Sequence, residues 1–189
     1  MTKKELRNIY KEKRLSLSDK ERSKLDDLLL IQFQRLSFDG IQVVLSFWPM
    51  DDRGEMNTHL FTRYLSHLIP ALQVCYPVTD PSTNIMKAVV VTEDTELEEN
   101  NYGITEPVNG REMDPMDIDL VLVPLFAFDD KGYRVGYGKG YYDRYLKQCD
   151  ERTIVVGLSY FEAVDVISDT NEYDVPLNYC ITPGKVYEF

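Results

Sequence analysis

The sequence is poor in cysteine and histidine, which often supply nucleophiles, general bases and transition-metal ligands. Its 189 residues include three cysteines and two histidines. Cys75, Cys149 and Cys180 lie far apart and form no Cys-x-x-Cys pair, so their spacing indicates neither a disulfide framework nor a zinc site. His59 and His67 do not belong to a recognisable catalytic triad, and no cysteine lies beside a base. A covalent hydrolase mechanism therefore has no support.

Long apolar segments are also absent. No stretch approaches the roughly 20 apolar residues that a membrane-spanning helix needs. The first 24 residues are charged throughout and lack the apolar segment of a secretory signal. We therefore expect a cytoplasmic protein that does not act at a membrane.

Positive charge is scarce overall and unevenly placed. The formal net charge is −11, which disfavours nucleic acid as a partner because phosphate backbones are bound through Lys and Arg. Nine of the 21 Lys and Arg residues nevertheless lie in the first 24 positions. An anionic substrate remains compatible with this sequence if such cations gather at one site.

Apolar periodicity and end signals predict helices that alternate with strands. Thr2 is a potential N-cap of a helix reaching Arg14, and Ser18 with Glu21 is a capping-box pattern that opens a helix through Leu36. A third helix is predicted over 55–68, and apolar, β-branched runs predict strands over 41–48, 72–77, 85–91, 119–124 and 153–158. This order is typical of an α/β fold, with a mostly parallel central sheet flanked by helices. The length fits a single domain over residues 1–189.

Glycine, cations and tyrosine gather in GYRVGYGKGYYDRYLKQC, residues 132–149. The segment follows a predicted strand and ends with helical spacing, an arrangement that presents free backbone N–H groups to a phosphate. Arg134 and Lys139 add positive charge, while Asp143 can stabilise the helix start or reach a magnesium ion.

The same segment does not match the known phosphate-loop patterns. Gly132 and Gly138 are one residue too far apart for a Walker loop, and Gly140 stands where that loop requires Ser or Thr. Local chemistry alone leaves two interpretations open: a phosphate loop, or a tight surface turn whose tyrosines pack on the core.

The motif GYRVGYGKGYYDRYL closely resembles the signature of the 5-formyltetrahydrofolate cyclo-ligases, also called methenyltetrahydrofolate synthetases. Further segments resemble the family in the same order along nearly the whole chain: KKELR at 3–7, GEMNT at 54–58, GITEP at 103–107, DLVLVP at 119–124, FAFDDKG at 126–132 and EYDVPLN at 172–178. The resemblance implies a fold similar to the ribose-phosphate isomerase and CoA-transferase superfamily. It also implies ATP- and Mg²⁺-dependent closure of 5-formyltetrahydrofolate to 5,10-methenyltetrahydrofolate, with release of ADP and phosphate.

The resemblance assigns roles to thirteen residues. Those implied to contact ATP are Lys3, Arg7, Arg134, Gly136, Tyr137, Gly138, Lys139, Gly140, Tyr141 and Tyr142. Lys139, Arg134 and Tyr142 are also implied to be catalytic, Glu55 and Tyr142 to contact the folate, and Asp143 and Asp174 to bind Mg²⁺. Phe47, Trp48 and Phe126 are candidates for the pterin pocket wall, although aromatic residues at strand ends usually belong to the core.

Simpler interpretations exist for several of these residues. Lys3 and Arg7 share one helix face at a spacing of four, but charged N-terminal helices are commonly just solvated. Glu55 can be an acid at a helix start, Asp143 a helix-terminus charge and Asp174 an ordinary loop acid.

Three positions depart from the family pattern. Leu125 stands where glycine is usual after VP, RVG replaces RLG at 134–136, and Asn178 replaces the acid that commonly ends DVPLD. Because Asn178 removes a charge, it is given no metal role.

The implied chemistry requires no enzyme nucleophile. The formyl oxygen attacks the γ-phosphate of ATP, N10 then attacks the resulting iminium phosphate, and phosphate leaves. We expect a monomer that binds 5-formyltetrahydrofolate, with or without a polyglutamate tail, and ATP. The alternatives are a non-catalytic nucleotide-binding module on the same fold and a sugar-phosphate isomerase or CoA-transferase, for which no catalytic carboxylate motif is found.

Overall fold

A computed structural model describes all 189 residues. The four α-helices are α1 (Lys3–Leu15), α2 (Asp19–Phe33), α3 (His59–Leu68) and α4 (Tyr141–Leu146), with 3-10 turns η1 (Asp51–Arg53) and η2 (Pro115–Asp117). The strands are β1 (Val43–Leu45), β2 (Gln73–Asp80), β3 (Ile85–Val90), β4 (Leu97–Glu99), β5 (Thr105–Pro107), β6 (Glu112–Met113), β7 (Leu120–Val123), β8 (Ala127–Phe128), β9 (Arg134–Val135), β10 (Ile154–Leu158), β11 (Tyr179–Ile181) and β12 (Val186–Glu188). None of the helices has the length and apolar character needed to span a bilayer.

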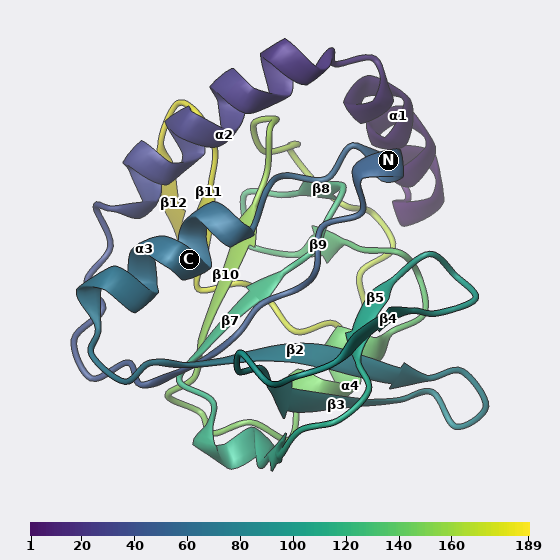
Figure 1. Cartoon of the computed structure of the whole chain (residues 1–189). Coiled ribbons are helices and arrows are strands. Elements are labelled where there is room, and N and C mark those ends of the chain that lie inside the picture. Colours follow the sequence, from purple (N-terminus) through teal and green to yellow (C-terminus); the bar gives the residue numbers. More distant parts are fainter.

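Eight strands form the central sheet, in the order β12-β11-β10-β7-β1-β2-β3-β6 (Figure 1). The strands from β11 to β2 are mutually parallel, whereas β12, β3 and β6 pair antiparallel at the two edges. The chain leaves β1 toward β2 on one side and later returns through β7 on the other side. This reversal of strand order opens a crevice at the carboxyl ends of β1 and β7, where α/β proteins commonly bind ligands.

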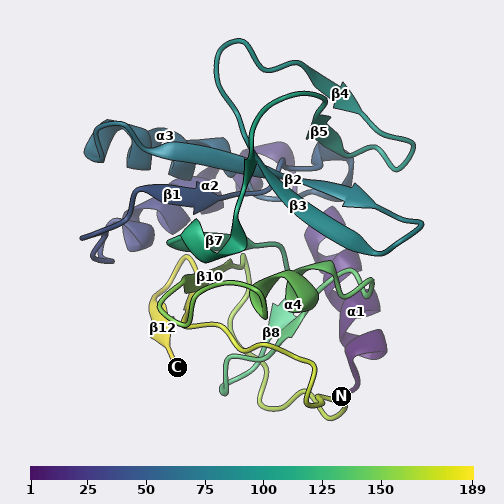
Figure 2. The ribbon, with the colours of Figure 1, turned by 90° about the horizontal axis from the view of Figure 1, so that it is seen from below.

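Alternate residues of each central strand pack on opposite faces of the sheet. Val44, Leu120 and Val156 face a core built with α2 and α3, whereas Val121 and Val155 face a core that includes Tyr145 and Leu146 of α4. Figure 2 shows α4 in front of these strands and α2 behind them. The predicted α/β class with a mostly parallel sheet is therefore confirmed.

The first helix lies outside these two layers, at the carboxyl edge of the sheet. Leu6 and Tyr10 pack on Phe126 and Val135 from the β8–β9 hairpin, and together form a third, smaller core (Figure 1). The helix starts at Thr2, whose side chain and Glu5 form a capping box. This docking brings the cationic N-terminal segment to the crevice.

The capping signals placed α1 and α2 correctly, but two helix boundaries were wrong. The second helix ends at Phe33 rather than Leu36. The third begins at His59 rather than Glu55, because Gly54 adopts a left-handed conformation (φ 62°) and closes a turn in which the Glu55 carboxylate accepts from the Met50 N–H. Glu55 is therefore not a helix-start acid.

A substitution at Gly157 on β10 would test how closely side chains pack against the sheet at this position. A Cβ atom there would lie 2.6 Å from Leu125 Cδ2 and 2.8 Å from Leu177 Cδ1, both buried side chains. Gly157→Ala is expected to lower the free energy of unfolding by about 1–3 kcal/mol, measured by urea denaturation. In the control Gly184→Ala, the nearest atom is the end of the Glu162 side chain, so stability should be almost unchanged. Equal stability of both variants would contradict this packing argument.

Candidate active site

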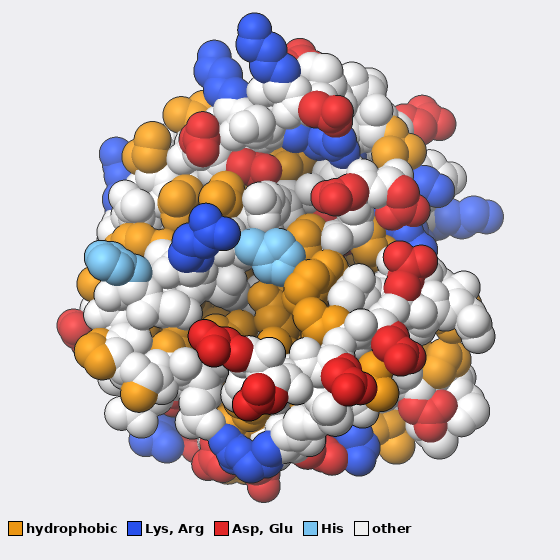
Figure 3. Space-filling view, viewed as in Figure 1, with side chains coloured by type: hydrophobic (Ala, Val, Ile, Leu, Met, Phe, Trp, Pro, Cys, Tyr) orange, Lys and Arg blue, Asp and Glu red, His pale blue; other side chains and the backbone are white.

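A cavity of about 670 Å³ opens at the carboxyl ends of the central strands. Its walls come from segments far apart in sequence: the start of α1, the segment after β1, the β2–β3 hairpin, the β4–β5 hairpin and residues 134–143. Figure 3 shows this side of the molecule, with hydrophobic side chains visible in a hollow near its centre and acidic side chains spread around it.

The structure brings all thirteen predicted site residues around this one cavity. They are Lys3, Arg7, Glu55, Arg134, Gly136, Tyr137, Gly138, Lys139, Gly140, Tyr141, Tyr142, Asp143 and Asp174. Their shared location agrees with the expected site, while the role of each residue remains a prediction.

The glycine segment, residues 136–140, is a loop between β9 and α4. Gly138 and Gly140 have φ angles of 89° and 69°, which favour glycine over other residues. The backbone N–H groups of Gly138, Lys139 and Gly140 donate to no protein acceptor. Unpaired donors at the start of a helix suit an anionic ligand such as phosphate.

Arg7 of α1 lies directly behind the glycine segment. Its Nε donates to the Gly136 carbonyl at 2.8 Å, and a Cβ atom at Gly138 would come within 3.2 Å of its Nη2. Arg7 is therefore not merely a solvated helix charge. Gly138 is required both for its backbone conformation and for this close approach.

Cations are concentrated at the cavity. The lining contains six Lys and Arg (Lys3, Lys4, Arg7, Arg53, Arg134, Lys139) and five Asp and Glu (Glu55, Glu106, Asp143, Asp169, Asp174). The whole chain carries 21 against 32. Cations therefore slightly outnumber acids in the cavity lining, whereas acids predominate in the chain as a whole, and this local excess of cations favours an anionic ligand.

Arg134 and Asp143 form an ion pair at the base of the loop. Arg134 Nη2 lies 2.8 Å from Asp143 Oδ1, and that oxygen also accepts from the Val175 N–H at 3.0 Å. Arg134 also donates to the Val175 carbonyl. The other carboxylate oxygen of Asp143 has no hydrogen-bond partner in the protein.

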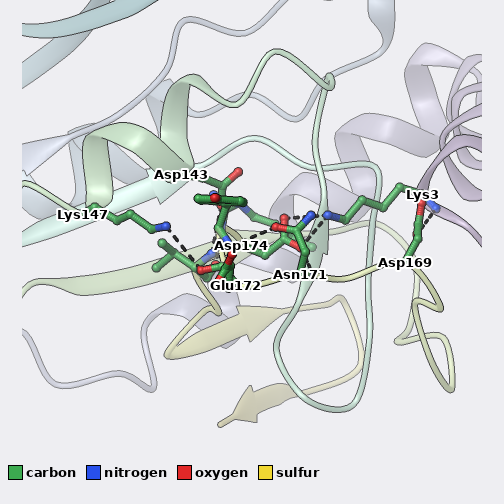
Figure 4. A network of polar contacts seen from close by, with 10 residues as sticks. Lys3, Asp143, Lys147, Asp169, Asn171, Glu172 and Asp174 are labelled. Atoms are coloured by element: carbon green, nitrogen blue, oxygen red, sulfur yellow. Dashed lines mark hydrogen bonds and ion pairs between the residues drawn. The ribbon is translucent and has the colours of Figure 1, made fainter.

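Asp174 is held by the N-terminal helix, as Figure 4 shows. Both of its oxygens lie 2.6 Å from Lys3 Nζ, and Oδ2 also accepts from the Asn171 N–H at 2.7 Å. Asp169 accepts from the Lys3 backbone N–H at 2.6 Å. No cluster of three or more His, Cys, Asp or Glu side chains is arranged to hold a metal ion.

Glu55 is the most deeply buried acid of the cavity, with 5 % of its surface exposed. One oxygen accepts from the Met50 N–H at 2.9 Å and the other from the Tyr137 hydroxyl. Burial raises the pKa of Glu55 above its usual value, while Tyr137, Met50 and the nearby arginines Arg14 and Arg53 oppose this rise.

Tyr142 presents an unpaired donor in the same cavity. Its hydroxyl is buried and has no hydrogen-bond partner in the protein. Burial raises the pKa of Tyr142, so the hydroxyl keeps its proton at neutral pH. A buried polar group without a partner is costly, and a bound ligand would satisfy it.

Aromatic side chains close the opposite end of the cavity. Trp48 and Phe47 line it as anticipated, and the Trp48 ring packs edge-on against His59 at 4.5 Å and tilted against Tyr76 at 5.3 Å. Phe126 does not line the cavity, which corrects that candidate assignment. Its ring is buried beneath Tyr137 in the α1 core.

Two of the departures from the family pattern have structural explanations. Asn178 does not line the cavity: its side-chain oxygen accepts from the Val155 N–H at 2.7 Å and ties β10 to the start of β11. Leu125 is buried and fits because its neighbour across the core is Gly157, which has no side chain. Neither substitution removes a charged group from the cavity.

Sequence reasoning gave no role to much of the wall formed by the β2–β5 region. Thr79, Pro81, Tyr102, Ile104 and Glu106 line the cavity, and Glu106 fixes the β4–β5 hairpin by accepting from the Thr79 N–H at 2.9 Å. The GITEP segment at 103–107 had been noted only as family-like. Its place beside β2 depends on long-range pairing that no local pattern reveals.

The family model for the 5-formyltetrahydrofolate cyclo-ligase family matches residues 1–183. The chain belongs to this family. The 5-formyltetrahydrofolate cyclo-ligase of Mycoplasma pneumoniae is 29% identical over 185 residues, covering 96% of this chain and 98% of that protein. The match to the Mycoplasma genitalium cyclo-ligase is 38% identical over 73 residues, so it covers 38% of this chain and 44% of that protein.

A solved structure agrees with this assignment. The NMR structure of Aquifex aeolicus 5,10-methenyltetrahydrofolate synthetase superposes with a TM-score of 0.81 at 31% identity, covering 100% of this chain and 93% of that one. The resemblance seen in the motifs is therefore confirmed, and with it the expectation of an ATP-dependent ligase of folate one-carbon metabolism.

The buried Glu55 carboxylate should reduce stability at neutral pH. Its pKa is raised on folding, so the charged form is disfavoured in the folded state and stability falls as pH rises from the unfolded pKa through the folded pKa. Glu55→Gln removes this titration but also loses one hydrogen bond, because its amide nitrogen cannot accept from Met50 or Tyr137. Relative to the parent protein, the variant is therefore expected to gain about 0.5–2 kcal/mol of stability between pH 4 and pH 7, on top of a loss that does not depend on pH. Urea denaturation of both proteins at several pH values checks this, and a relative loss over this pH range would show that folding favours the charged form.

Proposed function

We propose that this chain catalyses the ATP-dependent closure of 5-formyltetrahydrofolate to 5,10-methenyltetrahydrofolate, releasing ADP and phosphate. One observation carries the proposal: a glycine loop with unpaired N–H groups and the buried carboxylate of Glu55 face the same cavity. The first suits a phosphate chain and the second suits the N–H donors of a pterin. A ligand pair of this kind is what the family reaction requires.

The ATP phosphates would lie on the glycine loop. The N–H groups of residues 138–140 would donate to phosphate oxygens, and the Lys139 side chain, which is exposed and makes no ion pair, is available to the same oxygens. Arg7 stiffens the loop from behind through Gly136. Arg134 stays in its ion pair with Asp143 and lends positive charge at the base of the loop.

The folate would enter from the aromatic end, with its pterin against Trp48 and its N–H donors on Glu55. The carboxylate has about four acceptor positions, of which two are taken by Met50 and Tyr137, so two remain for the ligand. The unpaired Tyr142 hydroxyl would then donate to the formyl oxygen or to the phosphate that forms on it.

The two Asp side chains fit a magnesium ion that arrives with ATP. Asp143 offers a free carboxylate oxygen, and Asp174 becomes available when the Lys3 ammonium turns from it to a phosphate. With only two protein carboxylates, phosphate and water oxygens would complete the shell, as is usual for Mg²⁺. When bound, the ion neutralises charge on the transferring phosphoryl group.

The protein's main contribution is to hold the two substrates in contact. The formyl oxygen attacks the γ-phosphorus as ADP leaves. N10 then attacks the activated formyl carbon, loses its proton, and phosphate departs. Both the nucleophile and the electrophile belong to the substrates, so catalysis rests on orientation and charge stabilisation.

We further propose that residues 1–189 act as one domain, because segments spread from Lys3 to Asp174 line a single cavity, and that this domain acts as a monomer in the cytoplasm. A polyglutamate tail on the folate would extend from the cavity mouth toward solvent.

The direct test mixes purified protein with 5-formyltetrahydrofolate, Mg²⁺ and ATP, and follows the near-ultraviolet absorbance of the methenyl product. Product should form only with ATP present. ATP binding without product would instead support a non-catalytic nucleotide-binding module.

Lys139→Ala should weaken the use of ATP selectively. Loss of a charge-assisted contact to phosphate is expected to raise the KM for ATP roughly 10- to 100-fold, with a much smaller change in the KM for 5-formyltetrahydrofolate. Lys131→Ala is the matched control because Lys131 is exposed and lies outside the cavity. An unchanged KM for ATP in Lys139→Ala would reject the phosphate role.

Asp143→Asn should raise the Mg²⁺ concentration needed for half-maximal activity, by about tenfold, because an amide oxygen is a weaker ligand for a hard cation. Asp130→Asn replaces an exposed acid outside the cavity and should leave this titration unchanged. If the magnesium titration of Asp143→Asn coincided with that of the parent protein, Asp143 would not be a ligand.

A further inference from the structure

Arg14 is a buried cation with no acidic partner of its own. The residue is 3 % exposed and its guanidinium forms no ion pair. Nε donates to the Arg53 carbonyl at 2.8 Å, Nη1 to the Leu125 carbonyl at 3.4 Å and Nη2 to the Tyr137 hydroxyl at 2.9 Å. Its charge also lies 4.3 Å from the centre of the Phe126 ring. A buried charge is costly unless another charge compensates it, so the third contact is the informative one.

The contact with Tyr137 fixes the direction of a hydrogen-bond chain. A guanidinium can only donate, so the Tyr137 oxygen is the acceptor, and its single proton is free to point elsewhere. That proton points to Glu55, whose Oε1 accepts it. Arg14 is thereby linked through one phenol to the buried carboxylate of the cavity.

Packing holds the phenol in this position. The Tyr137 ring packs edge-on against Phe126, with 4.8 Å between the ring centres, and the Arg53 guanidinium carbon lies 5.3 Å from the centre of the Tyr137 ring. Tyr137 belongs to the glycine segment by sequence, but its hydroxyl is directed to the carboxylate of Glu55.

We infer that Arg14 and Tyr137 are positioning residues that hold Glu55 as an oriented, ionised acceptor for the N–H groups of the folate. The inference rests on the proposed function, since it assigns Glu55 to that substrate. Arg14 contacts no ligand in this scheme: it holds the Tyr137 hydroxyl and adds its own charge near Glu55. The two residues favour the charged form of an acid whose pKa is raised by burial.

The pKa of Glu55 depends on every charged or polar group that faces it. Arg14 of α1 and Arg53 of η1 favour the carboxylate, as do the Tyr137 hydroxyl and the Met50 N–H. Tyr142 of α4 also faces it, but its hydroxyl keeps its proton. Removing the Tyr137 hydroxyl takes away one favourable hydrogen bond, so the pKa of Glu55 should rise further.

The test measures how 5-formyltetrahydrofolate binding depends on pH in the absence of ATP. Trp48, the one tryptophan of the chain, lines the cavity and reports binding through its fluorescence. Affinity should fall as pH drops through the pKa of Glu55. This fall in affinity toward low pH is called the acid limb below. Tyr137→Phe keeps the ring and removes only the hydroxyl, and it should move the acid limb to higher pH by roughly one unit.

Three comparisons make the result specific. Tyr133→Phe, a matched change outside the cavity, should leave the limb in place, and Glu55→Gln should remove it. Arg14→Gln should move it in the same direction as Tyr137→Phe, and the double variant should move it by less than the sum of the two single shifts, since part of the effect of Arg14 passes through the Tyr137 hydroxyl. The Tyr137→Phe result decides the matter even if Arg14→Gln fails to fold.

The outcomes separate this inference from the proposed function. A limb that stays in place in Tyr137→Phe, with or without weaker binding, would overturn the positioning role while leaving the folate site intact. A parent protein that fails to bind 5-formyltetrahydrofolate at any pH would overturn both.

Discussion

The packing of α1 across the carboxyl edge of the sheet is the interaction on which the cavity depends. Leu6 and Tyr10 bury the helix against the β8–β9 hairpin, and this apolar contact fixes where the cations of the same helix can reach. Arg7 then supports the glycine segment through Gly136, and Arg14 joins the segments that follow β1 and β7. Loss of this helix would leave the glycine segment without its rear wall, even with the sheet intact.

The charges in the cavity are arranged so that ligand can replace protein partners. Lys3 with Asp174 and Arg134 with Asp143 are ion pairs in the structure, which limits the penalty of bringing both signs into a partly buried site. In the proposed function, a phosphate chain replaces Asp174 as the partner of Lys3 and a divalent cation replaces Lys3 as the partner of Asp174, while Arg134 stays paired with Asp143. The Glu55 carboxylate and the Tyr142 hydroxyl lack such complete compensation, because burial raises the pKa of Glu55 and the Tyr142 hydroxyl has no hydrogen-bond partner.

How much of this arrangement could be predicted from the sequence depended on the range of the interactions involved. Capping boxes and periodicity located α1, α2 and the central strands because those signals are local. The same approach placed Glu55 on a helix, since nothing nearby reveals that its carboxylate closes a turn with Met50. The sequence made Phe126 and Trp48 equal candidates for the cavity wall. In the structure α1 packs over Phe126 and buries it, whereas Trp48 lines the cavity. Glu106 reaches the cavity through pairing between distant strands.

In the proposed function, the stretch from Tyr137 to Tyr142 serves both substrates, and its alternation of residue types allows this. Gly138 and Gly140 leave backbone donors unpaired for the phosphates, while the Tyr137 side chain extends to Glu55 and the Tyr142 side chain lines the cavity. Because these residues lie within one short, continuous stretch, the phosphate position and the formyl position are set by the same backbone. Phosphoryl transfer to the formyl oxygen needs these two positions to be held within reacting distance. A rigid loop that binds one substrate with its backbone and the other with its side chains meets that requirement without any nucleophile from the protein.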